Sequence, residues 1–195
     1  VGLLEKNNFN GLSLANNHNL DQGRQGYEST LSALKEGRIN YFGEQTNDNS
    51  EPWRTTVKGK TFTFFGWNST DHIINRVVIG KRIKEARAAS DFIIVYMHWG
   101  SEYTSRPTTS QRQLGRDLID SGADVVIGAH PHVMQGMEIW QGKPIFWSLG
   151  NFIFDQDWSV DTQHGLILKL NFDSNKITVE PVLISVIKSQ PEVLA

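Results

Sequence analysis

The chain has 195 residues, of which 38% are hydrophobic and 21% are charged, a composition typical of a globular protein. Its 19 basic and 21 acidic residues give a formal charge of −2 and form no basic cluster, so we expect no nucleic-acid partner. The absence of cysteine excludes disulfides, thiolate catalysis and cysteine-bound zinc, and no apolar run approaches the roughly 18 residues of a membrane span.

The first half of the sequence alternates between strand and helix patterns. Strands are predicted from short apolar runs, and helices from apolar residues spaced three or four apart. The expected elements, in chain order, are the end of a helix within 1–9, a strand over 12–15, a helix from Gly23 to a stop at Gly37, a strand over 40–43, a solvated loop over 44–51, a hairpin of 53–57 and 61–67, a helix over 80–89, and a strand over 92–98.

The second half is richer in strands. Ser110 and Gln113 have the spacing of a capping box, which predicts that a helix begins there and ends at Gly122. A strand over 124–128 follows, and then two hairpins, 134–140 with 143–149 and 166–172 with 176–184. An alternating half followed by hairpins predicts one domain of class α/β, α+β in its second half, with two layered sheets and helices outside.

Four of the six histidines stand just past the end of an apolar run: His18, His98, His130 and His132. Such runs between helices predict buried parallel strands, and α/β sheets bind ligands beyond the carboxyl ends of their strands. We therefore expect three distant segments to bring imidazoles to one rim. Because imidazole is the commonest metal ligand and titrates near neutral pH, the group indicates a metal site with acid/base capacity.

The segment 128–132, GAHPH, carries the most specific of these motifs. In an extended segment alternate side chains point the same way, so His130 and His132 can face one small volume. Pro131 restricts both its own φ and the conformation of His130. The alternative is a loop with two solvated imidazoles, and we favour the metal site.

The segment 16–18, Asn-Asn-His, is followed closely by Asp21. An amide oxygen is a hard, weak metal ligand, His18 is a candidate proton donor, and Asp21 is placed to orient its ring. The alternative is a plain turn, because asparagine is favoured where φ is positive.

The other three histidines and one acid carry weaker signals. His98 has the alternative of a half-buried, hydrogen-bonded strand-end residue, and Glu102 is either a carboxylate supporting the site or an exposed loop acid. His72 and His164 stand in polar surroundings with no partner at a telling spacing, so we expect both at the surface.

Two further pairs are candidates near the rim. Asn151 and Asp155 follow the strand pattern that ends near Leu149, although packing accounts for most of that segment. Trp99 and Trp158 stand in predicted loops, where they would line a substrate groove rather than fill the core.

Four segments share their motifs, order and spacing with one family: 12–18 with Asp21 and Gly23, 98–103 with Pro107 and Gln111, 119–133, and 142–152. Together they closely resemble the bacterial capsule-synthesis family, the CapA or poly-γ-glutamate synthesis group. That family is a branch of the calcineurin-like metallophosphatase fold. The resemblance covers nearly the whole chain.

The resemblance implies a four-layer α/β/β/α sandwich with a two-metal centre at the strand ends, holding Mn, Fe or Zn. It implies that Asn17, His98 and His130 hold one divalent ion, that His132 contributes to the other, and that His18 is the acid beside the leaving group. It also implies an extracytoplasmic protein, membrane-associated through a segment outside this chain. An anionic polymer or a phosphate-containing substrate, and membrane proteins of capsule synthesis, are the expected partners.

One departure from the family pattern bears on this expectation. The family's first two acidic motifs have no counterpart in this sequence, so we expect residues 1–195 to be the later part of a domain that lacks its N-terminal strands. Two divalent ions ~4 Å apart repel strongly when only imidazoles and an amide hold them. Three hypotheses stay open: a metal-dependent capsule-synthesis protein, a general metal-dependent phosphoesterase, and a non-catalytic scaffold that has lost its metals.

Overall fold

The structure is a computed structural model that describes residues 1–43, 48–173 and 176–194. Its elements alternate as the sequence predicts, with strands concentrated in the second half. In chain order they are α1 (Gly2–Lys6), β1 (Gly11–Ser13), α2 (Gly23–Glu36), β2 (Asn40–Phe42), β3 (Trp53–Val57), β4 (Lys60–Asn68), α3 (Arg76–Ala86), the 3-10 helix η1 (Arg87–Ala89), β5 (Phe92–His98), α4 (Thr109–Asp120), β6 (Val125–Ala129), β7 (Met137–Trp140), β8 (Lys143–Phe146), β9 (His164–Asp173), β10 (Lys176–Ile187) and β11 (Gln190–Val193).

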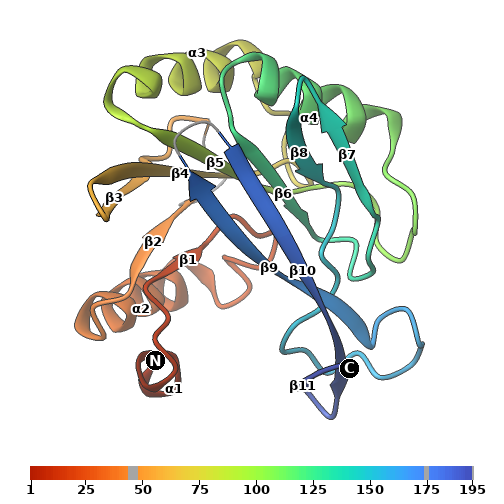
Figure 1. Cartoon of the computed structure of the whole chain (residues 1–195). Helices are drawn as coiled ribbons and strands as arrows, with labels where there is room; N and C mark the ends of the chain where they lie inside the picture. Colours follow the sequence, from red (N-terminus) through yellow and green to blue (C-terminus); the bar gives the residue numbers. More distant parts are fainter. Residues whose placement is uncertain (44–47, 174–175, 195) are drawn as a thin grey trace.

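A six-stranded sheet in the order β3-β4-β5-β6-β8-β7 forms the centre of the molecule (Figure 1). Its four inner strands are parallel, and β3 and β7 pair antiparallel at the two edges. The register places Asn68, His98 and Ala129 side by side at the carboxyl ends of β4, β5 and β6. The sheet therefore presents three chain segments at one rim.

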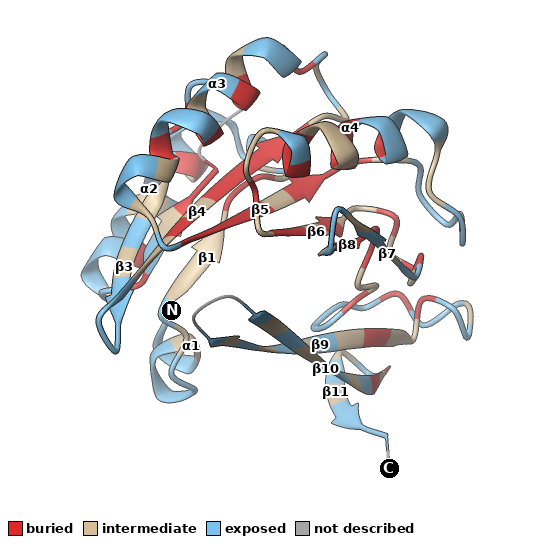
Figure 2. Ribbon diagram, turned by 45° about the horizontal axis from the view of Figure 1, so that its top comes forward, coloured by how far each residue is buried: buried red, intermediate tan, exposed pale blue. Residues whose placement is uncertain are grey.

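Helices α3 and α4 cover one face of this sheet, as Figure 2 shows. Ile79 and Ile83 of α3 and Leu118 of α4 are at most 1% exposed and pack on the strands below. Trp67 and Trp147 of the same cluster are among the largest fully buried side chains. This face is the main hydrophobic core, and its packing fixes the strand ends that carry the rim.

The opposite face is covered by a three-stranded antiparallel sheet in the order β11-β10-β9 (Figure 2). Phe92, Ile94 and Phe146 pack there against apolar side chains of β9 and β10, including Leu170 and Phe172. The two layered sheets that the sequence predicts are thus present, with helices α3 and α4 on the outer face of the larger one. The α/β class, with antiparallel hairpins in the second half, is confirmed.

Strands β1 and β2 form a separate parallel pair beside these layers. Helix α2 packs on them through Tyr27 and Leu34, which lie with Leu14 and Ile39 in a small cluster of their own. The Asn-Asn-His segment, which follows β1, therefore lies beside the main core and not within it. No helix among the described residues is long and apolar enough to cross a membrane.

The structure corrects two predicted helix starts. Helix α3 begins four residues earlier than predicted because the Asn75 side chain accepts from the backbone N–H groups of Val77 and Val78. The capping box of α4 is formed by Thr108 and Gln111 rather than by the predicted pair two residues later. In both cases a polar side chain nearer the loop satisfies the free N–H groups of the first turn.

The structure also corrects the predicted loop over 44–51. Residues 44–47 lie outside the described part, but Ser50 is 7% exposed and its hydroxyl donates to the carbonyl of Gly66. The carbonyl of Asp48 accepts from the Trp67 indole. The described end of this segment is therefore solvated only in part, because Asp48 and Ser50 contact β4 while Asn49 and Glu51 are exposed. Strand β11 is an element that the sequence did not predict.

Candidate metal centre

The parallel strands bring three of the predicted histidines together at the carboxyl rim of the sheet. His98 is the last residue of β5, and His130 and His132 follow the end of β6. The ring centroids of His98 and His130 are 4.8 Å apart, and those of His130 and His132 are 6.1 Å apart. The convergence expected from the strand pattern is present.

The backbone around these rings is unusual. His130 has φ of 95° and His132 has φ of 61°, in the region of positive φ that residues other than glycine adopt in only a few per cent of cases. Just before them, a Cβ on Gly128 would lie 2.1 Å from the carbonyl oxygen of Trp147, the same oxygen that accepts from the Trp99 indole at 2.9 Å. Glycine is thus required at position 128 for β6 to approach the end of β8 this closely. The turn that contains His130 and His132 follows directly.

Burial keeps the inner two imidazoles uncharged. His98 is 5% exposed, and its burial, together with the neighbouring imidazoles of His130 and His132, lowers its pKa to about 3. Burial also lowers the pKa of His130, against the opposing charges of Glu102 and Asp71. Both rings are therefore neutral near pH 7, the form in which histidine binds metals.

The Asn17 side chain links His98 to His18. Its oxygen accepts a hydrogen bond from Nε2 of His98 at 2.8 Å, and its nitrogen donates to Nε2 of His18 at 3.2 Å. Nδ1 of His18 lies 2.8 Å from the carboxylate of Asp21. The structure therefore joins Asn17, His18 and Asp21 to the rim and places Asp21 on the far nitrogen of the His18 ring, as the sequence analysis expected.

Glu102 supplies a carboxylate beside His132. Its Oε1 lies 4.0 Å from Nε2 of His132, and the ligand atoms of Glu102, His130 and His132 all lie within 4.8 Å of one another. The Glu102 side chain is 39% exposed, so it is a loop acid that also faces the site. The sequence left these two descriptions as alternatives, and the geometry combines them.

Asn151 reaches the site, whereas Asp155 does not touch it. Asn151 is 7% exposed and accepts from Nδ1 of His132 at 3.0 Å, while Asp155 lies exposed in the following loop. Trp158 is 65% exposed and contacts the ring of Tyr103 edge-on. Trp99, expected in a loop at a substrate groove, is 1% exposed and packs in the core against Trp147.

Two residues near the rim were not identified from the sequence. Asn68, 1% exposed, ends β4 beside His98 and donates to the carboxylate of Asp71 at 2.9 Å. Asp71 is close enough for its charge to act on His130. The rule that located the histidines, a polar residue after an apolar run, applies equally to Asn68 and would have found it.

The two histidines expected at the surface are both half-buried and have partners. His72 lies 3.4 Å from Asp48 through Nε2, and its other ring nitrogen is buried. Nδ1 of His164 donates to the carbonyl of Val160 at 2.7 Å. Both side chains are thus partly exposed, and each is hydrogen-bonded to a residue of a loop.

The donor set fits a divalent cation. Among the described residues Nδ1 of His130 is buried without a hydrogen-bond partner, so one polar atom at the rim is left unsatisfied. The oxygen of Asn17 and Nε2 of His98 are hydrogen-bonded at 2.8 Å, so both atoms lie in one small volume at the rim. Neutral imidazoles, an amide oxygen and one carboxylate suit Mn, Fe or Zn.

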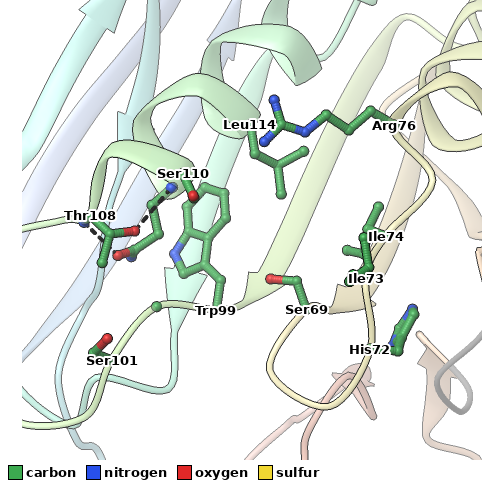
Figure 3. Close-up of a pocket in the computed structure, with 12 residues that line it drawn as sticks. Ser69, His72, Ile73, Ile74, Arg76, Trp99, Ser101, Thr108, Ser110 and Leu114 are labelled. Carbon is green, nitrogen blue, oxygen red and sulfur yellow. Dashed lines mark hydrogen bonds between the residues drawn. The ribbon is translucent and has the colours of Figure 1, made fainter.

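A cavity of about 410 Å³ adjoins this rim. It is lined by the segment after β5, by the first turns of α4 and by the connection from β4 to α3, and the histidines of the rim are not among its lining residues. Figure 3 shows how Ser69, Trp99, Ser101, Thr108, Ser110 and Leu114 surround it. The cavity thus shares the segment after His98 with the site but is separate from the candidate metal ligands.

The α/β fold is shared with solved structures of low sequence identity. A candidate 5′-nucleotidase from Staphylococcus aureus, solved in complex with α-ketoglutarate, superimposes with a TM-score of 0.65 over 95% of this chain and 39% of that one. The two sequences are 16% identical, so this similarity concerns the fold.

The sequence comparison identifies the family. The model of the family described as bacterial capsule synthesis protein PGA_cap matches residues 1–156, and the chain belongs to that family. It is 32% identical to the PGA biosynthesis protein CapA of Bacillus subtilis (strain 168), over 93% of this chain and 53% of that protein. It is 31% identical to the capsule biosynthesis protein CapA of Bacillus anthracis, over 98% of this chain and 51% of that protein. The chain thus spans about half the length of these curated relatives.

Proposed function

We propose that this chain contributes to capsule or poly-γ-glutamate synthesis through a divalent metal centre that supports hydrolysis of a phosphoester. The observation that carries the proposal is the meeting of His98, His130 and His132 at one rim, in a chain of the capsule synthesis family. Burial that keeps His98 and His130 neutral supports a ligand role for both.

Two groups of side chains are placed to hold the ions. Asn17, His98 and His130 form the first group, and His132 with Glu102 forms the second. When bound, divalent ions would act as Lewis acids that polarise a phosphate oxygen and offset its charge. Glu102 supplies negative charge where the other ligands are neutral, which lowers the repulsion between two cations.

His18 is placed to deliver a proton. Its Nε2 faces Asn17 at the site, while Nδ1 faces Asp21 on the far side. Asp21 holds the plane of the ring through Nδ1, so that Nε2 is the nitrogen directed to pass a proton to a departing alkoxide oxygen. Because the His18 side chain is 62% exposed, solvent can return the proton after each turnover.

The proposals on the substrate and the partners rest on the family and not on a binding pocket. We propose an anionic polymer or a phosphate-containing substrate, because a cationic centre at an open rim favours anions. We also propose that the protein acts outside the cytoplasm together with membrane proteins of capsule synthesis. Both proposals can fail while the metal centre stands.

Metal binding tests the centre directly. Calorimetric titration with Mn²⁺ is expected to show binding that falls at least about 100-fold in His130→Ala. The matched control is His164→Ala, which removes a half-buried histidine outside the rim and should leave the affinity within about twofold. Equal affinity in wild type and His130→Ala would reject the site.

Turnover separates a general phosphoesterase from a non-catalytic scaffold, and the pairing of His18 with Asp21 favours the enzyme. With Mn²⁺ bound, hydrolysis of an aryl phosphate is expected to fall roughly 10²- to 10⁴-fold in His18→Ala, while Mn²⁺ affinity is retained. Tight metal binding with no hydrolysis of aryl phosphate or poly-γ-glutamate would instead favour the scaffold.

A further inference from the structure

A buried polar network in the loop after β8 closes around one ring of the site. Asn151, Gln156 and Thr162 are at most 7% exposed, although all three have polar side chains. The Asn151 amide makes three hydrogen bonds: its oxygen accepts from Nδ1 of His132 at 3.0 Å, and its nitrogen donates to Oε1 of Gln156 at 3.1 Å and to the carbonyl of Thr162 at 3.0 Å.

These contacts fix which way the Asn151 amide points. The carbonyl of Thr162 can only accept a hydrogen bond, so the amide nitrogen must face it. The amide oxygen is then left facing His132, and an oxygen without a proton can only accept. Nδ1 of His132 must therefore carry the hydrogen.

We propose that Asn151 is a positioning residue that holds His132 in the Nδ1–H tautomer and so leaves Nε2 with a free lone pair. Nε2 is the atom that faces Glu102 at 4.0 Å, within the cluster that includes His130. The proposal deepens the metal centre described above and rests on it for its consequence. The tautomer itself is a property of the metal-free protein.

The surroundings of Asn151 are built to keep this orientation. Gln156 donates through Nε2 to the hydroxyl of Tyr103 at 3.2 Å, and the Thr162 hydroxyl donates to the carbonyl of Gln156 at 2.7 Å. The ring of Tyr103 stacks on His132, with centroids 5.8 Å apart and an interplanar angle of 23°. A buried network with every member satisfied resists rearrangement, because any flip leaves a polar group unpaired.

The chemical consequence concerns metal affinity. Which nitrogen of a histidine binds a metal is set by the hydrogen bond that the other nitrogen makes, and loss of such a partner typically lowers metal affinity 10- to 100-fold. Without Asn151, His132 would be free to protonate Nε2, the nitrogen that faces the site. The ring would also lose a restraint at a residue whose φ of 61° is already unfavourable.

Nitrogen NMR of histidine-labelled, metal-free protein tests the proposal at about pH 8.5, where imidazoles are neutral. In wild type, His132 is expected as the Nδ1–H tautomer. In Asn151→Leu, which keeps the side-chain volume but removes the acceptor, the signals should shift toward Nε2–H. The Kd for Mn²⁺ should rise roughly 10- to 100-fold in the same variant.

The matched control is Asp155→Asn, a change that keeps the side-chain size at an exposed residue of the same loop that does not touch the site. It should leave the tautomer unchanged and Mn²⁺ affinity within about twofold. An Nε2–H tautomer in wild type, or an unchanged tautomer in Asn151→Leu, overturns the proposal, and the wild-type measurement stands even if the variant fails to fold. If the tautomer responds as expected but wild type binds no Mn²⁺, the metal centre is rejected and tautomer control by Asn151 remains.

Discussion

The candidate site has a buried half and an exposed half, and both use histidine. His98 is 5% exposed at the end of β5, whereas the side chains of His18 and Asp21 are 62% and 57% exposed beyond β1. Burial lowers the pKa of His98 to about 3 and suits it to binding metal, while the open position of His18 suits proton exchange with solvent. The comparison indicates that burial, rather than residue type, separates the proposed metal ligand from the proposed acid.

The largest expected effect comes from charging the buried half. Unfolded His98 takes up a proton near pH 6.5, but in the folded protein its pKa is about 3, so the unfolded state binds more protons between these values. The stabilising contribution of neutral His98 is therefore fully present above about pH 6.5. It is lost as the pH falls toward 3, which lowers the free energy of unfolding by on the order of 4 kcal/mol. Urea unfolding with a chelator present, at several pH values, measures this loss.

The control for that measurement is His98→Gln, which keeps a polar side chain but does not titrate. Its free energy of unfolding should depend less steeply on pH than that of the wild type over the same window. Parallel curves for the two proteins would show that His98 is not held neutral by burial.

The next effect comes from crowding the buried half. In Gly128→Ala the new Cβ would meet the carbonyl of Trp147 at 2.1 Å, so β6 and β8 must separate. We expect a loss of about 3 kcal/mol in the free energy of unfolding, measured by urea denaturation. Gly2→Ala, where nothing lies within 4 Å, is the control and should change stability little, and equal stability of both variants would contradict the close approach.

A smaller effect is expected in the exposed half. Asp21→Asn keeps the side-chain size but removes the charge that faces Nδ1 of His18 at 2.8 Å. Turnover of an aryl phosphate should fall about tenfold, or ~1.4 kcal/mol, with Mn²⁺ affinity unchanged. If metal affinity falls and turnover does not, Asp21 supports metal binding. The exposed half would then not be specialised for proton transfer.

The smallest effect tests the helix that supports the segment after His98. Thr108→Ala removes the cap that accepts from the backbone N–H of Gln111 at 3.1 Å and should lower stability by about 1 kcal/mol. The neighbouring Thr109→Ala is the control, because Thr109 lies inside the helix and makes no such cap. Thermal unfolding of the two variants compares them, and a larger loss in Thr109→Ala would argue against the observed helix start.

Much of the fold was predictable because strand and helix patterns are local. The apolar run of β5 and the hairpin β9–β10 were found from periodicity alone, and the meeting of His98 with His130 followed from the rule that parallel strands end at one rim. The starts of α3 and α4 were missed by a few residues because several polar residues compete to cap a first turn, and only the final loop geometry selects one.

The sequence by itself determined which segments become strands, and hence which histidines reach the rim, since apolar runs must be buried. Only the tertiary structure decided what each side chain does there. It folded Glu102 toward His132, joined Asn17 to His98, and set Asn151 behind His132. These contacts join loops distant in sequence, and their geometry depends on how the strand ends and the connecting turns pack, which no local pattern records.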